Sequence, residues 1–389
     1  MRTEQWLILA VIWIADFAVF MVVFAVGRNL AETGSDSMVL GLAGGGFSLA
    51  LGMSSLLGGR LSDKVGRVRV MLTGLVGIAM CTAGCLVLGA EHPFYIPMYI
   101  LVAAATGLVY PPSVTLLSRG QDAVARSGIG RMIVFFCLAW NGGLISGQLT
   151  GGWLFHHDPV RPIQVAMVLT LINPFLLWLA VINQASLPTI PDQNTTPHLE
   201  HRANSAMFSR LAWMANLGGA FAMSMVFHLF PLLMIELEIP AREHGGLLAI
   251  SRGVVVLTYL LMYRVRIWHH RFSTAALSQI LAAGCLLVLA AADSRLGVIV
   301  GLIGLAQLLG YNYFASLYYS TTGVAEEQRG AASGMHEFTL AMGFAAGATV
   351  GGFVGQLAGS RAPYQLAAAV IMVLLVVQVT TLARIARRG

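Results

Sequence analysis

The sequence predicts an all-α polytopic membrane protein with twelve spanning helices in two pseudo-symmetric six-helix bundles. Of its 389 residues, 57% are hydrophobic, and the mean hydropathy is +0.77. Apolar runs of roughly 18 residues or more recur along the whole chain, which is the length that a helix needs to cross a bilayer. Only 10% of the residues are charged, and most of these lie between the runs. A soluble chain of this length does not need so much apolar surface.

Twelve apolar runs define the expected spans, six on each side of the one long polar segment. This segment, residues 186–206, contains prolines, Asp192 and Glu200, and we expect it to be a cytoplasmic linker. The bundles should therefore cover residues 1–185 and 207–389. The first apolar run carries Asp16 and is too long for a signal peptide, so we interpret it as a span. The expected spans are 6–30, 38–59, 70–89, 95–118, 132–155, 163–185, 207–235, 245–263, 273–292, 297–320, 332–358 and 364–383.

Loop charge predicts the orientation of the chain. Most arginines and the lysine at position 64 fall in alternate loops on one side, which the positive-inside rule assigns to the cytoplasm. Both termini are then cytoplasmic. The net charge of +6 is spread over these loops and forms no single patch, so we expect no nucleic-acid partner. Only five arginines fall near the other side: Arg28, Arg161, Arg242, Arg295 and Arg361.

The two halves repeat at an offset of 200 residues. Trp13 and Ala15 match Trp213 and Ala215, and five glycines in or just before the fifth run match five in or just before the eleventh. Such duplication predicts two related bundles around a central cavity. The matched glycines are Gly130, Gly143, Gly147, Gly151 and Gly152 with Gly330, Gly343, Gly347, Gly351 and Gly352.

A charged stretch, residues 59–69, separates the second and third apolar runs. It reads GRLSDKVGRVR and carries five charges, four of them positive. Such a stretch cannot cross hydrocarbon, so we expect a short cytoplasmic loop. Its pattern, G-x-L-x-D-K-x-G-R-x-R, resembles the loop between the second and third helices of the major facilitator superfamily of secondary transporters. The corresponding second-half loop, RVRIWHHR at 264–271, lacks the aspartate and the glycines.

The resemblance implies a bacterial inner-membrane transporter that works by alternating access, as a monomer and without a cofactor. It also implies a conformational latch that closes the cytoplasmic side. In this latch Asp63 would face the electropositive start of the eleventh span, and Arg67 would pair with an acid such as Asp122. Gly59 and Gly66 complete the latch motif.

Two features bear on the direction of transport. The ladder Gly143-x3-Gly147-Gln148-x2-Gly151-Gly152 resembles the antiporter motif of drug-exporting facilitators, with Gln148 in place of a proline. Close helix packing is the alternative explanation. Residues 102–107, in the fourth run, lack the arginine that drug–proton antiporters usually carry there, so their typical proton relay is not supported. Tyr110-Pro111-Pro112 should break this helix.

Three ionisable residues are candidates for proton coupling. Asp16 lies about ten residues into the first run, or roughly 15 Å at 1.5 Å per residue, which places it near the bilayer midplane. A carboxylate there should face a cavity, pair with a cation or be protonated. Its partner in the repeat is Asn216. His336 and Glu337 lie one to two turns inside the eleventh run. The alternative for Glu337 is a purely structural role, in which its charge interacts with the N-terminus of a helix.

Other polar residues in the runs are candidates for substrate binding. Arg252 lies about seven residues from the outer end of its run, where it could meet an anionic or zwitterionic substrate or one of the acids. Arg28 could instead extend to the membrane surface. The four cysteines fit core positions, and no metal-site pattern surrounds them. The substrate candidates are Arg28, Asn141, Asn216, His228, Arg252, Asn312 and Tyr313.

These observations predict a secondary active transporter of a small organic molecule, coupled to protons and embedded in the lipid bilayer, with a slight preference for export. Proton-coupled uptake, lipid or lysolipid transport, and a non-transporting sensor on the same fold are the alternatives. The sequence contains no Walker loop, HExxH motif or G-x-S-x-G elbow, so we expect no enzyme. It also lacks the charged rings and filter loops of channels.

Overall fold

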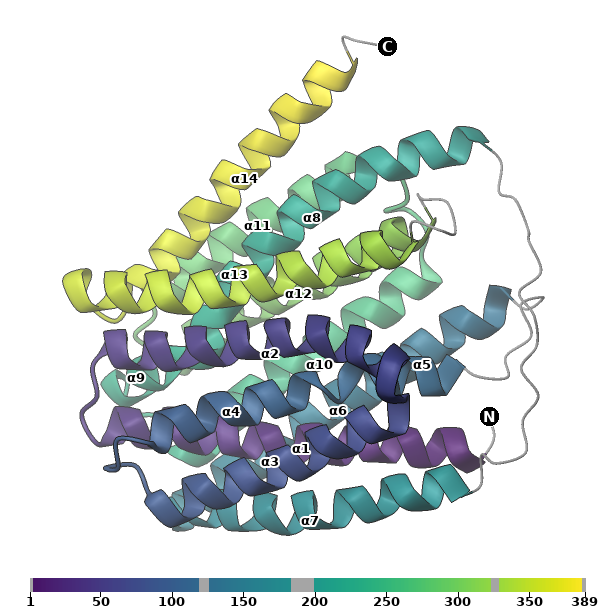
Figure 1. The fold of residues 1–389 in the computed structure, drawn as a ribbon. Coiled ribbons are helices and arrows are strands. Elements are labelled where there is room, and N and C mark those ends of the chain that lie inside the picture. The colour runs from purple at the N-terminus through teal and green to yellow at the C-terminus, as the bar shows by residue number, and fades with distance from the viewer. Residues whose placement is uncertain (1–2, 119–125, 183–198, 323–328, 387–389) are drawn as a thin grey trace. The chain divides into compact units, whose positions relative to one another are not determined.

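The computed structural model describes residues 3–118, 126–182, 199–322 and 329–386, and all regular structure in these ranges is α-helical (Figure 1). The first group of helices is α1 (Thr3–Glu32), α2 (Ser37–Val65), α3 (Arg67–Leu88), α4 (Tyr95–Gly107), α5 (Tyr110–Ser118), α6 (Arg126–His157) and α7 (Arg161–Ile182). The second group is α8 (Leu199–His228), α9 (Phe230–Glu236), α10 (Ala241–Arg264), α11 (Phe272–Ala290), α12 (Arg295–Thr322), α13 (Arg329–Ala358) and α14 (Ala362–Ala386).

Every predicted span has its helix or pair of helices. In the part of the chain that the structure describes, ten helical segments are long and apolar enough to cross a membrane, and one of these, Tyr95–Leu117, joins α4 to α5. The pair α8 and α9 makes an eleventh if it is counted as one span bent by 49°. The remaining long helix is α6, which coincides with the predicted fifth span. The predicted all-helical membrane fold is therefore confirmed.

The charged stretch at residues 59–69 is helical rather than a loop. Helix α2 continues to Val65, Gly66 alone separates it from α3, and α3 begins at Arg67. Gly66 has a φ of 102°, which a glycine adopts without strain. The predicted loop was wrong because a helix bonds its own backbone and can leave the membrane without ending. Within these last turns the hydroxyl of Ser62 donates a hydrogen bond to the carbonyl of Gly59, 2.8 Å away.

The helices form two compact units, and the division falls inside α2 and α10. Each of these two helices contributes its first turns to one unit and its remaining turns to the other. Unit 1 comprises Met1–Thr33, Leu49–Thr195 and Ile239–Ala249. Unit 2 comprises Gly34–Ser48, Thr196–Glu238 and Ile250–Gly389.

Glycine contacts explain how the first turns of α10 and α2 join their units. In unit 1, a Cβ atom on Gly245 of α10 would lie only 2.9 Å from the Cα atom of Gly152 on α6. In unit 2, a Cβ atom on Gly41 of α2 would lie 2.6 Å from the Cα atom of Gly352 on α13. Only residues without a side chain let two helix backbones approach so closely. The glycines thus fix which helices pair within each unit.

Contacts of two further glycines reveal the internal repeat, in which the partner helix is shifted by one helical turn. A Cβ atom on Gly143 of α6 would lie 2.7 Å from the Cβ atom of Asp16 on α1, and one on Gly343 of α13 would lie 2.7 Å from that of Ala220 on α8. Gly143 and Gly343 differ by 200 positions, whereas Asp16 and Ala220 differ by 204. The predicted pairing of Asp16 with Asn216 was therefore wrong by one turn.

Candidate functional site

In unit 1, the first candidate site is Asp16 with the break between α4 and α5. Asp16 is fully buried on α1, and its Oδ1 atom accepts a hydrogen bond from the hydroxyl of Tyr110. Tyr110 is the first residue of α5, directly after the break at Leu108 and Val109. The Oδ2 atom of Asp16 has no hydrogen-bond partner among the described residues. Sequence reasoning predicted both Asp16 and the helix break but missed the contact between them.

The free-energy cost of burying this carboxylate depends strongly on whether it is protonated. An ionised carboxylate needs hydrogen bonds or a cation to replace its lost hydration, and here the described residues offer Oδ2 neither. A proton on Oδ2 would remove the charge, while the bond from Tyr110 to Oδ1 could persist. The arrangement therefore suits a group that binds and releases a proton.

The other unit 1 candidates have local partners. The amide of Asn141 on α6 donates to the carbonyl of Cys137, 2.9 Å away on the same helix. Arg28 is buried on α1, and its Nε atom lies 2.7 Å from Oε1 of Glu32, one turn further on. Sequence reasoning missed this i, i+4 ion pair. The guanidinium that we expected to bind a substrate is therefore paired with Glu32. Neither Asn141 nor Arg28 forms a hydrogen bond with Asp16 in the structure.

In unit 2, residues from α12 and α13 surround the buried His336. Its Nδ1 atom lies 2.7 Å from the hydroxyl of Ser316, and its ring centroid lies 4.8 Å from that of Tyr313. Its Nε2 atom lies 3.8 Å from Oε1 of Glu337, whose side chain is 54% exposed. Ser316 was not predicted, although it lies one turn after Tyr313 and so shares its helix face.

Asn216 of α8 joins this group from a third helix. Its amide nitrogen lies 3.4 Å from the backbone carbonyl of His336 and 3.3 Å from the hydroxyl of Thr339. Four predicted residues, Asn216, Tyr313, His336 and Glu337, therefore lie together at the junction of α8, α12 and α13. The sequence already placed His336 beside Glu337, but it gave no reason to bring Asn216 and Tyr313 to them from two other spans.

Arg252 of α10 lies buried against aromatic residues. Its side chain is only 3% exposed, and its guanidinium carbon lies 4.3 Å from the ring centroid of Phe227. Its Nε atom has no hydrogen-bond partner, and its charge has no ion pair with any described residue. Phe227 in turn packs against Phe344 at a centroid distance of 5.8 Å. Neither phenylalanine was predicted.

A second tyrosine connects Arg252 to the residues around His336. Tyr259 lies two turns after Arg252 on α10, and its ring centroid is 5.8 Å from that of Tyr313. Arg252 and Tyr259 share one face of α10, and we call the set of five residues around them the unit 2 strip. The strip comprises Phe227, Arg252, Tyr259, Tyr313 and His336. The neighbouring His228 packs aside, with its Nε2 atom 3.5 Å from the hydroxyl of Ser48. Its ring also lies beside the strip residue Phe227, at a centroid distance of 6.3 Å.

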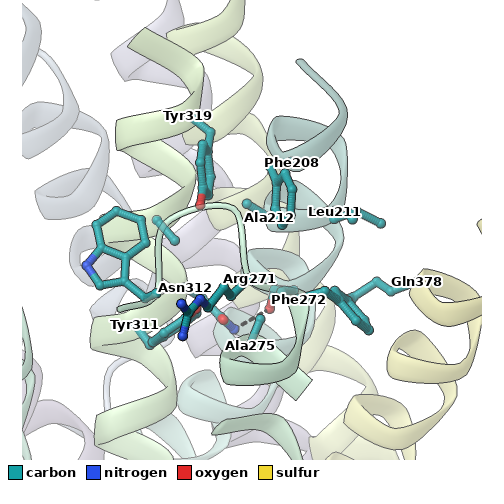
Figure 2. Close-up of a pocket in the computed structure, with 13 residues that line it drawn as sticks. Phe208, Leu211, Ala212, Arg271, Phe272, Ala275, Tyr311, Asn312, Tyr319 and Gln378 are labelled. Carbon is teal, nitrogen blue, oxygen red and sulfur yellow. Dashed lines mark hydrogen bonds between the residues drawn. The ribbon is translucent and has the colours of Figure 1, made fainter. Parts of the chain in front are cut away.

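Asn312 faces a different direction from Tyr313. Its amide nitrogen donates to the carbonyl of Ala215, 2.7 Å away, and it lines a pocket between α8, α11, α12 and α14 (Figure 2). Consecutive residues of a helix point about 100° apart, which explains the separation. The structure therefore brings Tyr313 into the strip but not Asn312.

The latch remains a prediction. Asp63 is exposed near the end of α2, and Arg67 is half-buried at the start of α3. Asp122, the expected partner of Arg67, lies outside the described residues. Within the part of the chain that the structure describes, no group of three or more His, Cys, Asp or Glu side chains could hold a metal ion.

The fold is that of a helical membrane protein. Residues 8–325 match the family model described as Major Facilitator Superfamily, and the chain therefore belongs to this superfamily. It is an integral membrane protein with a transporter fold. No curated protein sequence matches the chain closely enough to add to this assignment.

Several solved transporters have similar structures. A peptide transporter of the POT family, PepTSo, is 10% identical, with a TM-score of 0.77 over 100% of this chain and 99% of its own. A bacterial homologue of the human lysosomal transporter Spinster is 13% identical, with a TM-score of 0.70 over 97% and 96% of the two chains. The human organic anion transporter TETRAN is 14% identical, with a TM-score of 0.65 over 97% and 100%.

Proposed function

We propose that this protein is a proton-coupled secondary transporter of a small organic anion or zwitterion that works by alternating access. We further propose that it acts as a monomer in a bacterial inner membrane, with both termini in the cytoplasm. The observation that carries the substrate class is Arg252, a buried guanidinium that lies over Phe227 and has no ion pair with a described residue.

The chemistry around Arg252 favours an anion with an apolar part. A buried cation without a counter-ion is costly, and a substrate carboxylate would supply the missing charge. The guanidinium also offers a planar set of donors that matches a carboxylate. Tyr259 and Tyr313 continue the strip with aromatic surface against which an apolar portion of the substrate could pack. Similarity at 10–14% identity supports the fold alone, so the proposed substrate class depends on these residues.

Proton coupling is proposed for Asp16, with His336 and Glu337 as a second titratable pair. Protonation of Asp16 would change which conformation of the carrier is favoured, because only a difference in free energy between states can shift their populations. Tyr110 would transmit this change to the break between α4 and α5. Asp16 and Arg252 lie in different units, so each is described by its own surroundings and tested by its own variant.

The direction of transport follows from the sign of the proton movement. The glycine ladder of α6 favoured exchange of substrate against protons, but its members pack against backbone atoms. A Cβ atom on Gly147 would lie 2.7 Å from the carbonyl of Phe17, and one on Gly152 would lie 2.6 Å from that of Ala241. Helix packing is thus a sufficient explanation for the ladder. Uptake by symport is therefore kept as the alternative to export.

The test uses purified protein in liposomes that contain a pH-sensitive dye. A panel of carboxylates, dipeptides and uncharged analogues of similar size is added, and proton movement and substrate uptake are measured together. We expect wild type to move protons only with the charged substrates. Asp16→Asn should bind substrate and lose the coupled proton movement.

Arg252 is tested in the same liposomes against a control on its own helix. Arg252→Gln should weaken binding of the anion about tenfold or more, as expected when a contact to a charged group is removed. Arg242→Gln removes the same charge from an exposed position in the first turn of α10 and should leave affinity unchanged. Equal losses in both variants, or transport of uncharged analogues as good as that of the anions, would rule out the proposed substrate class.

A further inference from the structure

The pocket of unit 2 that Asn312 lines shares no residue with the strip. It lies between α8, α11, α12 and α14, and the empty space in it and at its mouth, open solvent included, is about 350 Å³. Much of its wall is aromatic or aliphatic. Figure 2 shows Arg271 and Asn312 on the side opposite Phe208 and Tyr319. Because one side is open, the pocket can hold one end of an elongated molecule.

Two side chains of this wall have unused hydrogen-bonding capacity. Asn312 is only 1% exposed, and its Oδ1 atom has no hydrogen-bond partner among the described residues. A buried acceptor in this state is expected to take a donor from a ligand or water. The guanidinium of Arg271 makes no hydrogen bond or ion pair with a described residue. The wall therefore offers one acceptor and one cation.

The start of α11 adds further donors to the same wall. The helix begins at Phe272, which lines the pocket, and Arg271 at its N-cap makes no side-chain capping bond. The first backbone N–H groups of a helix have no partners within the helix and favour an anion. Other polar groups nearby are already bonded: the indole of Trp268 donates to the carbonyl of Met262 at 2.9 Å, and the hydroxyl of Tyr319 accepts from the N–H of His270 at 2.8 Å.

We propose that this pocket binds the head of an anionic amphiphile that carries a hydroxyl group beside its oxyanion. The oxyanion would bind Arg271 and the N-terminus of α11, and the hydroxyl would donate to Oδ1 of Asn312. The apolar part would pack against Phe208 and Phe272. Because these helices span a membrane, the source with this chemistry is an anionic phospholipid with a glycerol head group. Soluble glycerol phosphate offers the same head without the tail.

The experiment measures thermal unfolding of the full chain in an uncharged detergent. The added probes are dioleoylphosphatidylglycerol, dioleoylphosphatidylcholine and glycerol 3-phosphate. Arg271→Gln removes the cation of the pocket, and Arg264→Gln removes an exposed charge near the same α10–α11 connection that does not line it. Ala275→Phe fills the pocket without changing any charge.

We expect phosphatidylglycerol, and not phosphatidylcholine, to raise the Tm of wild type and of Arg264→Gln. The concentration for half the effect should rise about tenfold in Arg271→Gln, and the effect should be lost in Ala275→Phe. An equal response to glycerol 3-phosphate, with the same dependence on the variants, would support the site and identify its ligand as soluble.

Other results would overturn the proposal. One is a wild-type Tm that does not respond to phosphatidylglycerol or to glycerol 3-phosphate. Another is an equal loss in Arg264→Gln and Arg271→Gln, which would indicate attraction to general surface charge. If Arg271→Gln does not fold, an unchanged lipid response in Ala275→Phe would overturn it by itself.

Discussion

At the scale of single residues, Asp16 and Tyr110 show how one contact changes the interpretation of a sequence. The position of Asp16 in an apolar run was enough to mark it as unusual. The tyrosine that bonds it lies 94 positions away, beside prolines that explain the helix break on their own. Periodicity indicates which face a side chain occupies, but not which distant side chain meets it. For this reason the acid was predicted and its partner was not.

The hydrogen bond predicts a specific defect in Tyr110→Phe. The ring is retained, so packing should be preserved and the protein should fold. The ionised form of Asp16 loses a donor, and bonds to charged groups contribute about 1.5–3 kcal/mol. We expect coupled proton flux to be lower than in wild type, and its dependence on pH to change, in dye-loaded liposomes.

The control for this prediction is Tyr99→Phe, a buried tyrosine of α4 that makes no recorded contact with Asp16. If Tyr110→Phe and wild type give the same pH profile, the hydroxyl has no part in coupling.

At the scale of helices, hydropathy located every span, whereas the contacts between helices required the structure. The one-turn shift of the repeat is an example. Aligned glycines gave the offset for α6 and α13, but α1 and α8 follow an offset four residues larger. Sequence identity at a few small residues does not fix the register of their partners. Hydropathy also ended α2 too early, because it follows apolar character and not backbone hydrogen bonding.

Two neighbouring glycines of α10 give opposite predictions. A Cβ atom on Gly245 would clash with the backbone of α6 at Gln148 and Gly152, whereas one on Gly246 would have no atom within 4 Å. We expect Gly245→Ala to lower the Tm, because the helices must separate. Gly246→Ala should raise it, by up to about 1 kcal/mol of unfolding free energy, because alanine restricts the unfolded chain. Similar changes in the two variants would contradict this packing.

The amides of Gln279 and Gln378 predict a coupled pair between α11 and α14. Each donates to the other, at 3.1 and 3.0 Å, and both side chains are buried. Gln279→Leu should cost about 1–3 kcal/mol of stability, because it leaves the amide of Gln378 unpaired. The double variant Gln279→Leu/Gln378→Leu should recover much of this loss. Chemical unfolding of the three variants measures the coupling, and strictly additive effects would show that the pair is not coupled.

At the scale of the whole molecule, several arginines of the less basic side have acidic partners. Arg28 pairs with Glu32, and Arg361 lies 2.8 Å from Glu236 and 2.9 Å from Asp293. The hydrogen bonds to Glu236 and then to Asp293 raise the pKa of Arg361 above its ordinary value, so it remains a cation. By contrast, Arg60 of α2 has no ion pair with a described residue. Arg60 is thus a basic residue without an acidic partner among the described residues, on the side that the positive-inside rule predicts to be cytoplasmic.

This contrast supports a prediction for topology. A fluorescent protein fused after residue 389 should fold and fluoresce if the C-terminus lies in the cytoplasm. Alkaline phosphatase inserted into the connection of residues 238–240 is active only on the outer side of the membrane, and we expect it to be active there. The opposite pair of signals would reverse the proposed orientation without affecting the fold.

The junction of α2 and α3 has a mechanical consequence. A single residue, Gly66, connects two long helices, and its φ of 102° leaves it as the only place where their directions can differ. Because one residue connects them, we expect a tilt of α2 to be transmitted to α3. Inserting a few flexible residues at Gly66 would uncouple the orientation of α2 from that of α3 while every side chain of both helices is kept.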